Sequence, residues 1–351
     1  MMRRLFFFMS TVVILAYSNL VLANSAPVVS NVTASQRGDD SKLVDIYYSL
    51  TDADGDNCTI WVFVSDDDGV SWRVPAWAFS GHVGSGVTPG SKHVIWDAAT
   101  DVPGRIGSFK VRVYADDGNG TAPKVLVPGG LFAFNNTPNP DDWVYVDSFL
   151  IDKYEVTNQF YCQFLNDSDP DGTYWHSEME IERFGVAGNY SYSVQAGREN
   201  CPVRWLQRSW ASAFCVWRSD LEGMTYRLPT EQEWEKAAAW DPVEQHYYKY
   251  GYHQDSVIDC SWCNWNGSAC ISNTTEVGRY NGSNGTNDAK SYYGCYDMSG
   301  NVREFVEGNI SKGGGWSDGT TGNMVLYHVF DASGSTHADN LGFRCVMVVD
   351  P

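Results

Sequence analysis

The stretch Tyr226-Arg-Leu-Pro-Thr-Glu-Gln-Glu-Trp-Glu-Lys-Ala-Ala-Ala-Trp240 has the pattern of a helix start followed by one buried face. Pro229 has a fixed φ that suits the first turn of a helix, and the negative charge of Glu231 favours the positive end of the helix dipole. Trp234 and Ala237 lie three residues apart, so their side chains share one helix face. We therefore expect a helix whose Trp234 face packs into the protein core.

The segment Arg227-Leu-Pro-Thr-Glu-x-Glu-Trp-Glu235 resembles the central signature of the formylglycine-generating enzyme family, also called sulfatase-modifying factors. Further pieces that resemble this family follow its expected order, namely Ile151-Asp-Lys-Tyr-Glu-Val-Thr-Asn158, Pro202-Val-x-Trp205, Trp210-Ala-Ser-Ala-Phe-Cys215, Tyr293-Gly-Cys-Tyr-Asp-Met-Ser-Gly-Asn-Val302, Gly313-Gly-Gly-Trp316 and Leu341-Gly-Phe-Arg-Cys345. The resemblance implies a sulfatase-modifying-factor domain over residues 125–351. Its fold would be that of a C-type lectin, a loop-rich mixture of small sheets and a few helices.

The N-terminus has the pattern of a secretory signal peptide, which we place at residues 1–23. Arg3 and Arg4 supply positive charge, Leu5–Tyr17 is an apolar run, and Val21-Leu-Ala23 provides small residues for cleavage. The alternative is an uncleaved anchor, although the run is shorter than the ~20 apolar residues that a spanning helix needs. We expect a mature protein without a membrane span that is secreted, periplasmic or held at the cell surface.

Short β-branched and aromatic runs, separated by turn signals, fill residues 26–118. The runs are Val28–Val32, Leu43–Tyr48, Thr59–Val64, Lys92–Trp96 and Phe109–Tyr114. Several short strands in a segment of this length favour an immunoglobulin- or fibronectin-type-III-like sandwich. The turn cluster Asp116-Asp-Gly-Asn-Gly120 marks the end of this domain, and we expect few contacts across it. The expected fold class is therefore α+β with two domains, an all-β sandwich followed by the C-type-lectin-like domain.

The second domain mixes short periodic segments with long polar ones. We expect strands at Val127–Phe132 and Trp143–Ile151, a helix at Thr157–Leu165 capped by Thr157 or Asn158, and long surface loops at residues 167–200 and 247–290.

The formal net charge of −19, from 24 basic and 43 acidic residues, restricts the classes of partner. An acidic surface repels phosphate backbones, so nucleic-acid binding is not expected. The same surface suits calcium or cationic partners, although simple solubility explains it equally well.

The chain contains nine cysteines, and in an exported protein cysteines favour disulfides over metal clusters. Cys260-x-x-Cys263, followed by Cys270, is the tightest cluster, and no neighbouring cysteine pair or histidine cluster supplies the fourth ligand of a zinc site. The odd total leaves one thiol unpaired within the chain, and Cys58 is the best candidate because its own domain holds no other cysteine. The pairing of the following cysteines stays open: Cys162, Cys201, Cys260, Cys263, Cys270 and Cys295.

The resemblance implies one specific disulfide and one kind of chemistry. In the family, the cysteine of an Ala-Tyr-Cys-like helix pairs with that of the final Gly-Phe-Arg-Cys motif, which implies a Cys215–Cys345 bond here. Active members oxidise a sulfatase cysteine to formylglycine with a copper ion held by two cysteines. Those cysteines precede the final motif, and the matching interval Trp316–Arg344 contains none. Met324 and His328 lie in it, but a lone Met and a lone His are more often packing residues than copper ligands.

A related branch of the family makes sulfoxides with non-haem iron, which is held largely by a His-rich motif in an extra helical domain. The seven histidines of this chain are scattered, and the first domain is expected to be β. Copper and iron are therefore not expected, and we assign no catalytic residue.

Active members also bind structural calcium, and the residues that match their ligands are Asp297, Gly300, Val302 and Glu304. Carboxylate and carbonyl oxygens are the hard donors that calcium requires. Arg303, where the family usually has Trp, would bring a positive charge near the ion. The alternative interpretation is an Asp/Gly turn that leads into a strand. A second calcium site of the family begins at an Asn that matches Asn264, without a recognisable Asp partner.

The missing cysteine pair favours a non-catalytic protein. The predicted function is a calcium-stabilised scaffold that binds a protein, peptide or glycan on its loop face. The alternative is an oxidoreductase of the formylglycine-generating or non-haem-iron sulfoxide synthase family that uses atypical metal ligands.

Overall fold

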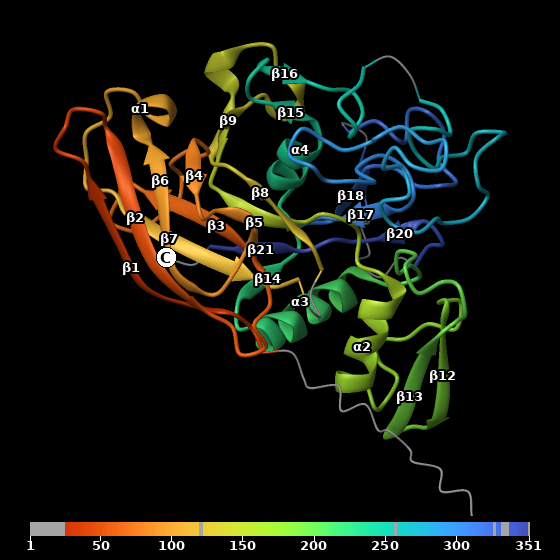
Figure 1. Ribbon diagram of the computed structural model, residues 1–351. Helices are drawn as coiled ribbons and strands as arrows, with labels where there is room; N and C mark the ends of the chain where they lie inside the picture. Colours follow the sequence, from red (N-terminus) through yellow and green to blue (C-terminus); the bar gives the residue numbers. More distant parts are fainter. Residues whose placement is uncertain (1–24, 119–121, 256–257, 326–327, 331–336, 350–351) are drawn as a thin grey trace, which may run out of the picture.

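The computed structural model describes residues 25–118, 122–255, 258–325, 328–330 and 337–349 (Figure 1). The predicted signal peptide at residues 1–23 lies outside this part of the chain. Within the described residues, we find no helix that is both long and apolar enough to span a membrane. Short strands, long loops and a few helices make up the structure, which agrees with the expected C-type-lectin-like fold.

Residues 25–118 form two antiparallel sheets around a shared core. Their elements are β1 (Val28–Gln36), β2 (Leu43–Thr51), β3 (Cys58–Ser65), β4 (Phe79–Gly81), β5 (Gly84–Val87), β6 (Gly90–Asp97), α1 (Ala98–Asp101) and β7 (Lys110–Asp116). One sheet has the order β1-β2-β6-β4 and the other β5-β3-β7.

Side-chain alternation produces this arrangement. In β2, Ile46, Tyr48 and Leu50 are buried in the core, whereas Tyr47 between them is exposed. The strands predicted in this segment are confirmed. Their assignment to an immunoglobulin or fibronectin type III family stays a prediction.

The second part of the chain combines short helices with small sheets. Its elements are β8 (Lys124–Val127), β9 (Gly130–Phe132), η1 (Phe134–Asn136), η2 (Pro140–Asp142), β10 (Val144–Val146), β11 (Phe149–Asp152), α2 (Asn158–Ser168), β12 (Ile181–Val186), β13 (Asn189–Val194), α3 (Arg208–Glu222), β14 (Thr225–Arg227), α4 (Glu231–Ala239), β15 (Trp240–Asp241), β16 (His246–Tyr247), β17 (Arg303–Phe305), β18 (Ile310–Lys312), β19 (His328–Phe330), β20 (Leu341–Gly342) and β21 (Val346–Val348). The larger sheets have the orders β14-β21-β11-β8 and β19-β18-β17-β20.

Helix α4 forms where the sequence predicts it, but Thr230 and not Pro229 fixes its start. Thr230 Oγ1 accepts a hydrogen bond from the Glu233 N–H at 3.1 Å, and the Glu233 carboxylate accepts one from the Thr230 N–H at 2.8 Å. This reciprocal pair is a capping box, which satisfies two N–H groups at the helix start. Pro229 therefore precedes the helix. Trp234 and Ala237 are fully buried, as predicted.

The strand predicted at Val127–Phe132 is divided into β8 and β9. Pro128 has no N–H to donate to a strand ladder. A Cβ at Gly129 would lie 2.7 Å from the backbone oxygen of Arg73, so the chain can pass there only as glycine. The segment Trp143–Ile151 is likewise divided, into β10 and β11.

Helix α2 is confirmed, with Thr157 as its cap, because Thr157 Oγ1 accepts the Phe160 N–H at 3.2 Å. The surface loop predicted at residues 167–200 is wrong in part, since it contains the hairpin β12–β13. Ile181 and Tyr192 of this hairpin are buried in the same core as α2. The sequence of β12 does not show this burial as a simple alternation, because Phe184 and Val186 are apolar but exposed. The described residues between β16 and β17 form loops, as predicted.

Contacts cross the predicted domain boundary, contrary to the expectation from the turn cluster. Trp72 is buried in a core that also contains Leu150 of β11. Lys124 Nζ lies 2.7 Å from an Asp116 carboxylate oxygen and 3.3 Å from a Glu222 carboxylate oxygen, and its side chain is buried. The sandwich and the second part therefore share buried surface.

Candidate functional site

A buried ion pair lies between β17 and the loop that joins β20 to β21. Arg344, in that loop, donates from Nε and Nη2 to the two carboxylate oxygens of Glu304, each at 2.7 Å. Its guanidinium also donates to the backbone oxygens of Asp152, Lys153 and Tyr296. Glu304 Oε2 accepts a further hydrogen bond from Trp234 Nε1 at 2.8 Å, which connects this site to α4. Both charged side chains are fully buried.

Two more carboxylates are buried beside this pair. Asp297 Oδ2 accepts the Gly278 N–H at 2.6 Å. Desolvation raises the pKa of Asp297 to about 6, and the charge of Glu304 adds to that effect. Desolvation, followed by the charges of Asp297 and Glu304, raises the pKa of Glu155 well above its usual range.

If all of these carboxylates were ionised, negative charge would be left uncompensated in the interior. One guanidinium, of Arg344, accompanies the carboxylates of Glu155, Asp297 and Glu304. Glu155 Oε1 is buried and has no hydrogen-bond partner in the described part of the chain. Burial of unpaired charge is costly, so the region suits a bound cation.

Asn264 lies against the predicted calcium turn. Gly300 has a φ of 90°, and a Cβ there would lie 2.4 Å from the Asn264 backbone oxygen. Asn264 Oδ1 is buried without a hydrogen-bond partner among the described residues, and Val302 is fully buried. Residues from the two implied calcium sites therefore meet in one buried region.

Arg303 does not bring its charge to this region, which corrects the sequence interpretation. Its Nε donates to Asp318 Oδ2 at 2.9 Å, and its Nη2 donates to Asp318 Oδ1 at 3.3 Å. Neighbouring side chains in a strand point to opposite faces, so Arg303 and Glu304 diverge in β17. The cation that acts on Asp297 is Arg344.

The residues present fit calcium in charge and donor type. Asp297 and Glu155 offer carboxylate oxygens, and Gly300 and Val302 would add backbone oxygens. Glu304 already accepts hydrogen bonds at both oxygens. No three His, Cys, Asp or Glu side chains of the described residues form a group that could hold an ion, so backbone oxygens would be required. Glu155 was missed, although it stands in the family-like stretch around Val156.

We expect calcium to stabilise the protein, because a ligand that binds only the native state stabilises it by mass action. At a calcium concentration of ~100 times Kd the gain is about 2.7 kcal/mol, which corresponds to roughly 4 °C in Tm for one cooperative unit of this length. Differential scanning calorimetry with calcium and with chelator measures it. Asp297→Ala should reduce or abolish the difference.

The matched control is Asp288→Ala, because Asp288 forms a half-exposed ion pair with Lys290 outside the predicted ligand set. This variant should keep the calcium response. An equal Tm with excess calcium and with chelator, after confirmed removal of metal from the wild type, contradicts the calcium site.

The interval that lacks the copper cysteines holds packing residues where it is described. Met324 packs against an aromatic cluster that includes Tyr250 and Tyr252. The backbone of His328 lies in β19, and its side chain is outside the described part of the structure. Met324 is therefore explained by packing.

Two histidines that are distant in the sequence meet here, His337 from within this interval and His176 from an earlier segment. The ring of His176 stacks on His337 with centroids 4.9 Å apart and on Trp205 with centroids 5.5 Å apart. Trp210 contacts His337 edge-on, with centroids 5.0 Å apart. The sequence contains no motif that predicts this cluster of aromatic rings, because its members come from separate segments. Histidines bind metals through ring nitrogens, whereas His176 and His337 present their faces to each other.

The cysteines are organised in part as predicted. A disulfide joins Cys260 to Cys270, whereas Cys263 is a buried free thiol. Cys58 is buried and free, but so are six other cysteines, so its assignment as the odd thiol stays a prediction. The Sγ atoms of Cys215 and Cys345 lie 3.3 Å apart as thiols, so their bond stays a prediction that the geometry favours.

Burial makes these thiols poor nucleophiles. It raises the pKa to about 11 for Cys58, Cys201 and Cys295. It also raises the pKa of Cys162, Cys263 and Cys345. Reactive cysteines require a lowered pKa and access to solvent, and these have neither.

The loops of residues 247–302, called the loop face here, contain a hollow of about 330 Å³. It is lined by Tyr252, His253, Gln254, Trp262, Asp288, Lys290, Ser291 and Tyr292. Trp262 stacks on Tyr252 with centroids 5.3 Å apart, and Lys290 Nζ lies 2.6 Å from an Asp288 oxygen. Aromatic faces beside hydrogen-bonding groups are suited to sugars and peptides.

Comparison with known proteins identifies the family that the second part of the chain resembles. Residues 112–349 match the model of the sulfatase-modifying factor enzyme 1-like domain. The chaperone protein LppX of Paenibacillus barcinonensis is 30% identical over 246 residues, which cover 60% of this chain and 84% of that protein. The inactive C-alpha-formylglycine-generating enzyme 2 of Bos taurus is 28% identical over 287 residues, which cover 65% of this chain and 89% of that protein.

Among solved structures, the crystal structure of CarF is similar in fold. The match has a TM-score of 0.51 and 20% sequence identity, and it covers 66% of this chain and 99% of CarF. This likeness supports the fold of the second part and carries no statement about activity.

Proposed function

Because the chain belongs to the family of the sulfatase-modifying factor enzyme 1-like domain, we propose that it is a non-catalytic member of that family. In this proposal, the protein is exported, is stabilised by calcium, and binds a protein, peptide or glycan on its loop face. Two relatives have names that agree with such a role, since one is called a chaperone and the other inactive.

The cysteines carry the non-catalytic part of the proposal. The interval Trp316–Arg344 contains no cysteine, so it offers no thiolate pair for copper. Cys345 lies beside Cys215 in the interior, and burial raises its pKa. Cys295 is also buried, with a pKa raised to about 11. None of these thiols has the low pKa that captures a substrate cysteine.

The hollow on the loop face supports the binding part of the proposal. Trp262 contributes a half-buried ring, and Asp288 and Lys290 contribute charged groups at a half-exposed position. Large loops held by a rigid scaffold are the usual carriers of recognition. The Cys260–Cys270 disulfide restrains the loop that contains Trp262.

The alternative function is an oxidoreductase with atypical metal ligands. The approach of His176 to His337 is the observation that favours it. Their stacked rings would have to turn before both could direct a nitrogen to one ion. We therefore prefer the non-catalytic function.

We expect no conversion of a sulfatase-type Cys-x-Pro-x-Arg peptide to the aldehyde, with or without added copper. The physical reason is that no accessible thiolate is available to hold copper or to capture the substrate cysteine. Mass spectrometry of the peptide measures the result, with an active formylglycine-generating enzyme as positive control. Protein-dependent aldehyde formation, or stoichiometric copper or iron in the purified protein, would overturn the non-catalytic function.

The binding function is tested on peptide and glycan arrays probed with the full chain. Trp262→Ala should remove specific binding, because it deletes the aromatic face of the hollow. Phe184→Ala is the control, since Phe184 is an exposed aromatic residue of the β12–β13 hairpin. Binding that both variants lose equally, or that neither loses, contradicts the assignment to this hollow.

A further inference from the structure

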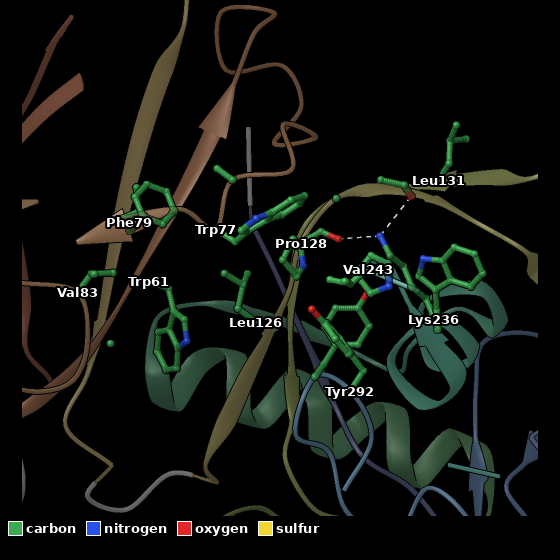
Figure 2. Close-up of a pocket in the computed structure, with 18 of the residues that line it drawn as sticks. Trp61, Trp77, Phe79, Val83, Leu126, Pro128, Leu131, Lys236, Val243 and Tyr292 are labelled. Carbon is green, nitrogen blue, oxygen red and sulfur yellow. Dashed lines mark hydrogen bonds between the residues drawn. The ribbon is translucent and has the colours of Figure 1, made fainter. Parts of the chain in front are cut away.

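A second cavity, of about 430 Å³, opens where the sandwich meets the second part of the chain (Figure 2). Trp61, Phe79 and Val83 approach it from the sandwich, and Leu126 and Tyr292 line it from the other part. Its size is that of a small-molecule site, and junctions of this kind are frequent places for such sites.

Large apolar side chains are exposed around this cavity. Trp77 is 54% exposed and Val243 is 78% exposed, and Leu131 and Tyr292 are also exposed. Single exposed apolar residues are ordinary, but several around one cavity indicate a binding site. No Asp or Glu of the described chain lines this cavity, although the protein is strongly acidic.

One buried cation lines the cavity. Lys236 is 2% exposed, and its Nζ donates to the backbone oxygens of Pro128 at 2.7 Å and Gly130 at 3.2 Å (Figure 2). No carboxylate of the described residues forms an ion pair with it, and Asp147 acts on it only through space. A third ammonium hydrogen remains for another acceptor.

A second donor lines the cavity close to Lys236 in the sequence. Trp240 follows the last residue of α4, its backbone N–H donates to the Lys236 backbone oxygen, and its side chain also lines the cavity. The Trp240 indole N–H is buried and has no hydrogen-bond partner in the part of the chain that is described. Buried donors of this kind call for an acceptor.

We propose that this cavity binds a small monocarboxylate with an apolar body, with its carboxylate at the Lys236 and Trp240 side. The apolar body would lie among Trp61, Trp77 and Leu126. The class includes medium-chain fatty acids and aryl-alkyl carboxylates. This site is separate from the hollow on the loop face, and its existence does not depend on the function proposed above.

The amine of Lys236 favours an anionic ligand over a neutral one. Desolvation lowers the pKa of Lys236 to about 7, because the amine has no bonded counter-ion and Asp147 offsets the effect only in part. A bound carboxylate would supply that counter-ion and stabilise the charged amine. The other titratable groups that line the cavity are Tyr292 and Tyr293, and burial raises the pKa of both, so they stay neutral.

The first measurement is calorimetric titration of the full chain with octanoate, 3-phenylpropanoate and octanamide. We expect saturable 1:1 binding of at least one carboxylate, and binding of octanamide that is at least about tenfold weaker at pH 6.5. The comparison of octanoate with 3-phenylpropanoate distinguishes an aliphatic from an aromatic body. Absence of carboxylate binding, or equal binding of octanoate and octanamide, overturns the proposal.

The pH dependence of carboxylate affinity tests whether Lys236 is the group that binds the carboxylate. Carboxylate binding favours protonated Lys236, so affinity should fall above the pKa of about 7, by about tenfold per pH unit, until the pKa of the amine in the complex is reached. Lys236→Met should weaken octanoate binding by about tenfold or more and remove this dependence. An unchanged pH profile in Lys236→Met overturns the assignment.

Because Lys236 is buried, surface variants keep the proposal testable if Lys236→Met fails to fold. Val243→Glu puts a negative charge beside the cavity and should weaken octanoate binding several-fold at low salt. Val216→Glu is the matched control, since Val216 is 62% exposed in α3 and does not line the cavity. Equal affinities of these two variants overturn the proposed location.

Discussion

Arg344→Met is expected to lower the free energy of unfolding by about 3–5 kcal/mol, the cost of leaving a buried charge without its partner. Arg344 makes paired hydrogen bonds to Glu304 and binds three backbone oxygens, all in the interior. Its removal would leave the carboxylates of Glu155, Asp297 and Glu304 without their nearest cation. Urea denaturation measures the loss, with chelator present so that calcium does not mask it.

A double variant separates the charge from the packing. Arg344→Met combined with Glu304→Gln should be more stable than Arg344→Met alone, because one uncompensated charge is removed. Arg37→Met is the partly exposed control, and its ion pair with Asp45 should contribute far less than the fully buried pair. A loss for Arg344→Met no larger than for Arg37→Met would contradict the structural role of the guanidinium.

The second large effect concerns Cys215 and Cys345, which we expect to be bonded in the oxidised protein. The Sγ atoms lie 3.3 Å apart across a sequence separation of 130 residues. In the chain-entropy model, closing a loop of this length stabilises the folded state by about 4–5 kcal/mol. Cys215→Ala should therefore lower the free energy of unfolding of the oxidised protein by nearly that amount.

Non-reducing peptide mapping tests the bond directly, and both residues found as thiols or bonded elsewhere would refute it. Cys260→Ser is the comparison, because the Cys260–Cys270 bond closes a sequence separation of only 10 residues. The chain-entropy model gives it a smaller effect, of about 3 kcal/mol or less. A larger effect for Cys260→Ser than for Cys215→Ala would contradict the order predicted here.

Local chemistry made much of the fold predictable. Trp234 and Ala237 of α4 were assigned to a buried face from spacing alone, and Thr157 was one of the two caps predicted for α2. Prediction failed where a distant segment decided the conformation. The strand is broken at Pro128, which has no N–H for the ladder, and at Gly129, where the distant Arg73 backbone passes close by; only the second contact has no local signal.

The candidate site was predictable only along its own motif. Asp297, Gly300 and Val302 follow from one stretch of sequence, as does Glu304. Arg344 and Glu155 lie beside Glu304 but come from other segments of the chain, so their charges were not included in the site predicted from the sequence. Arg303 was misjudged because sequence proximity to Glu304 does not mean that the two side chains share a strand face.

The buried contacts between the sandwich and the second part have a consequence for the chain as a folding unit. Trp72 belongs to a core that is mostly built by residues after the turn cluster at residues 116–120. Lys124, whose side chain is buried, forms ion pairs with both Asp116 and Glu222. A fragment cut at this turn cluster would expose an apolar surface, and its Lys124 would lose the ion pair with Asp116. Heating the intact chain should then melt both halves in one cooperative transition, and trimming at residue 125 would yield a protein that tends to aggregate.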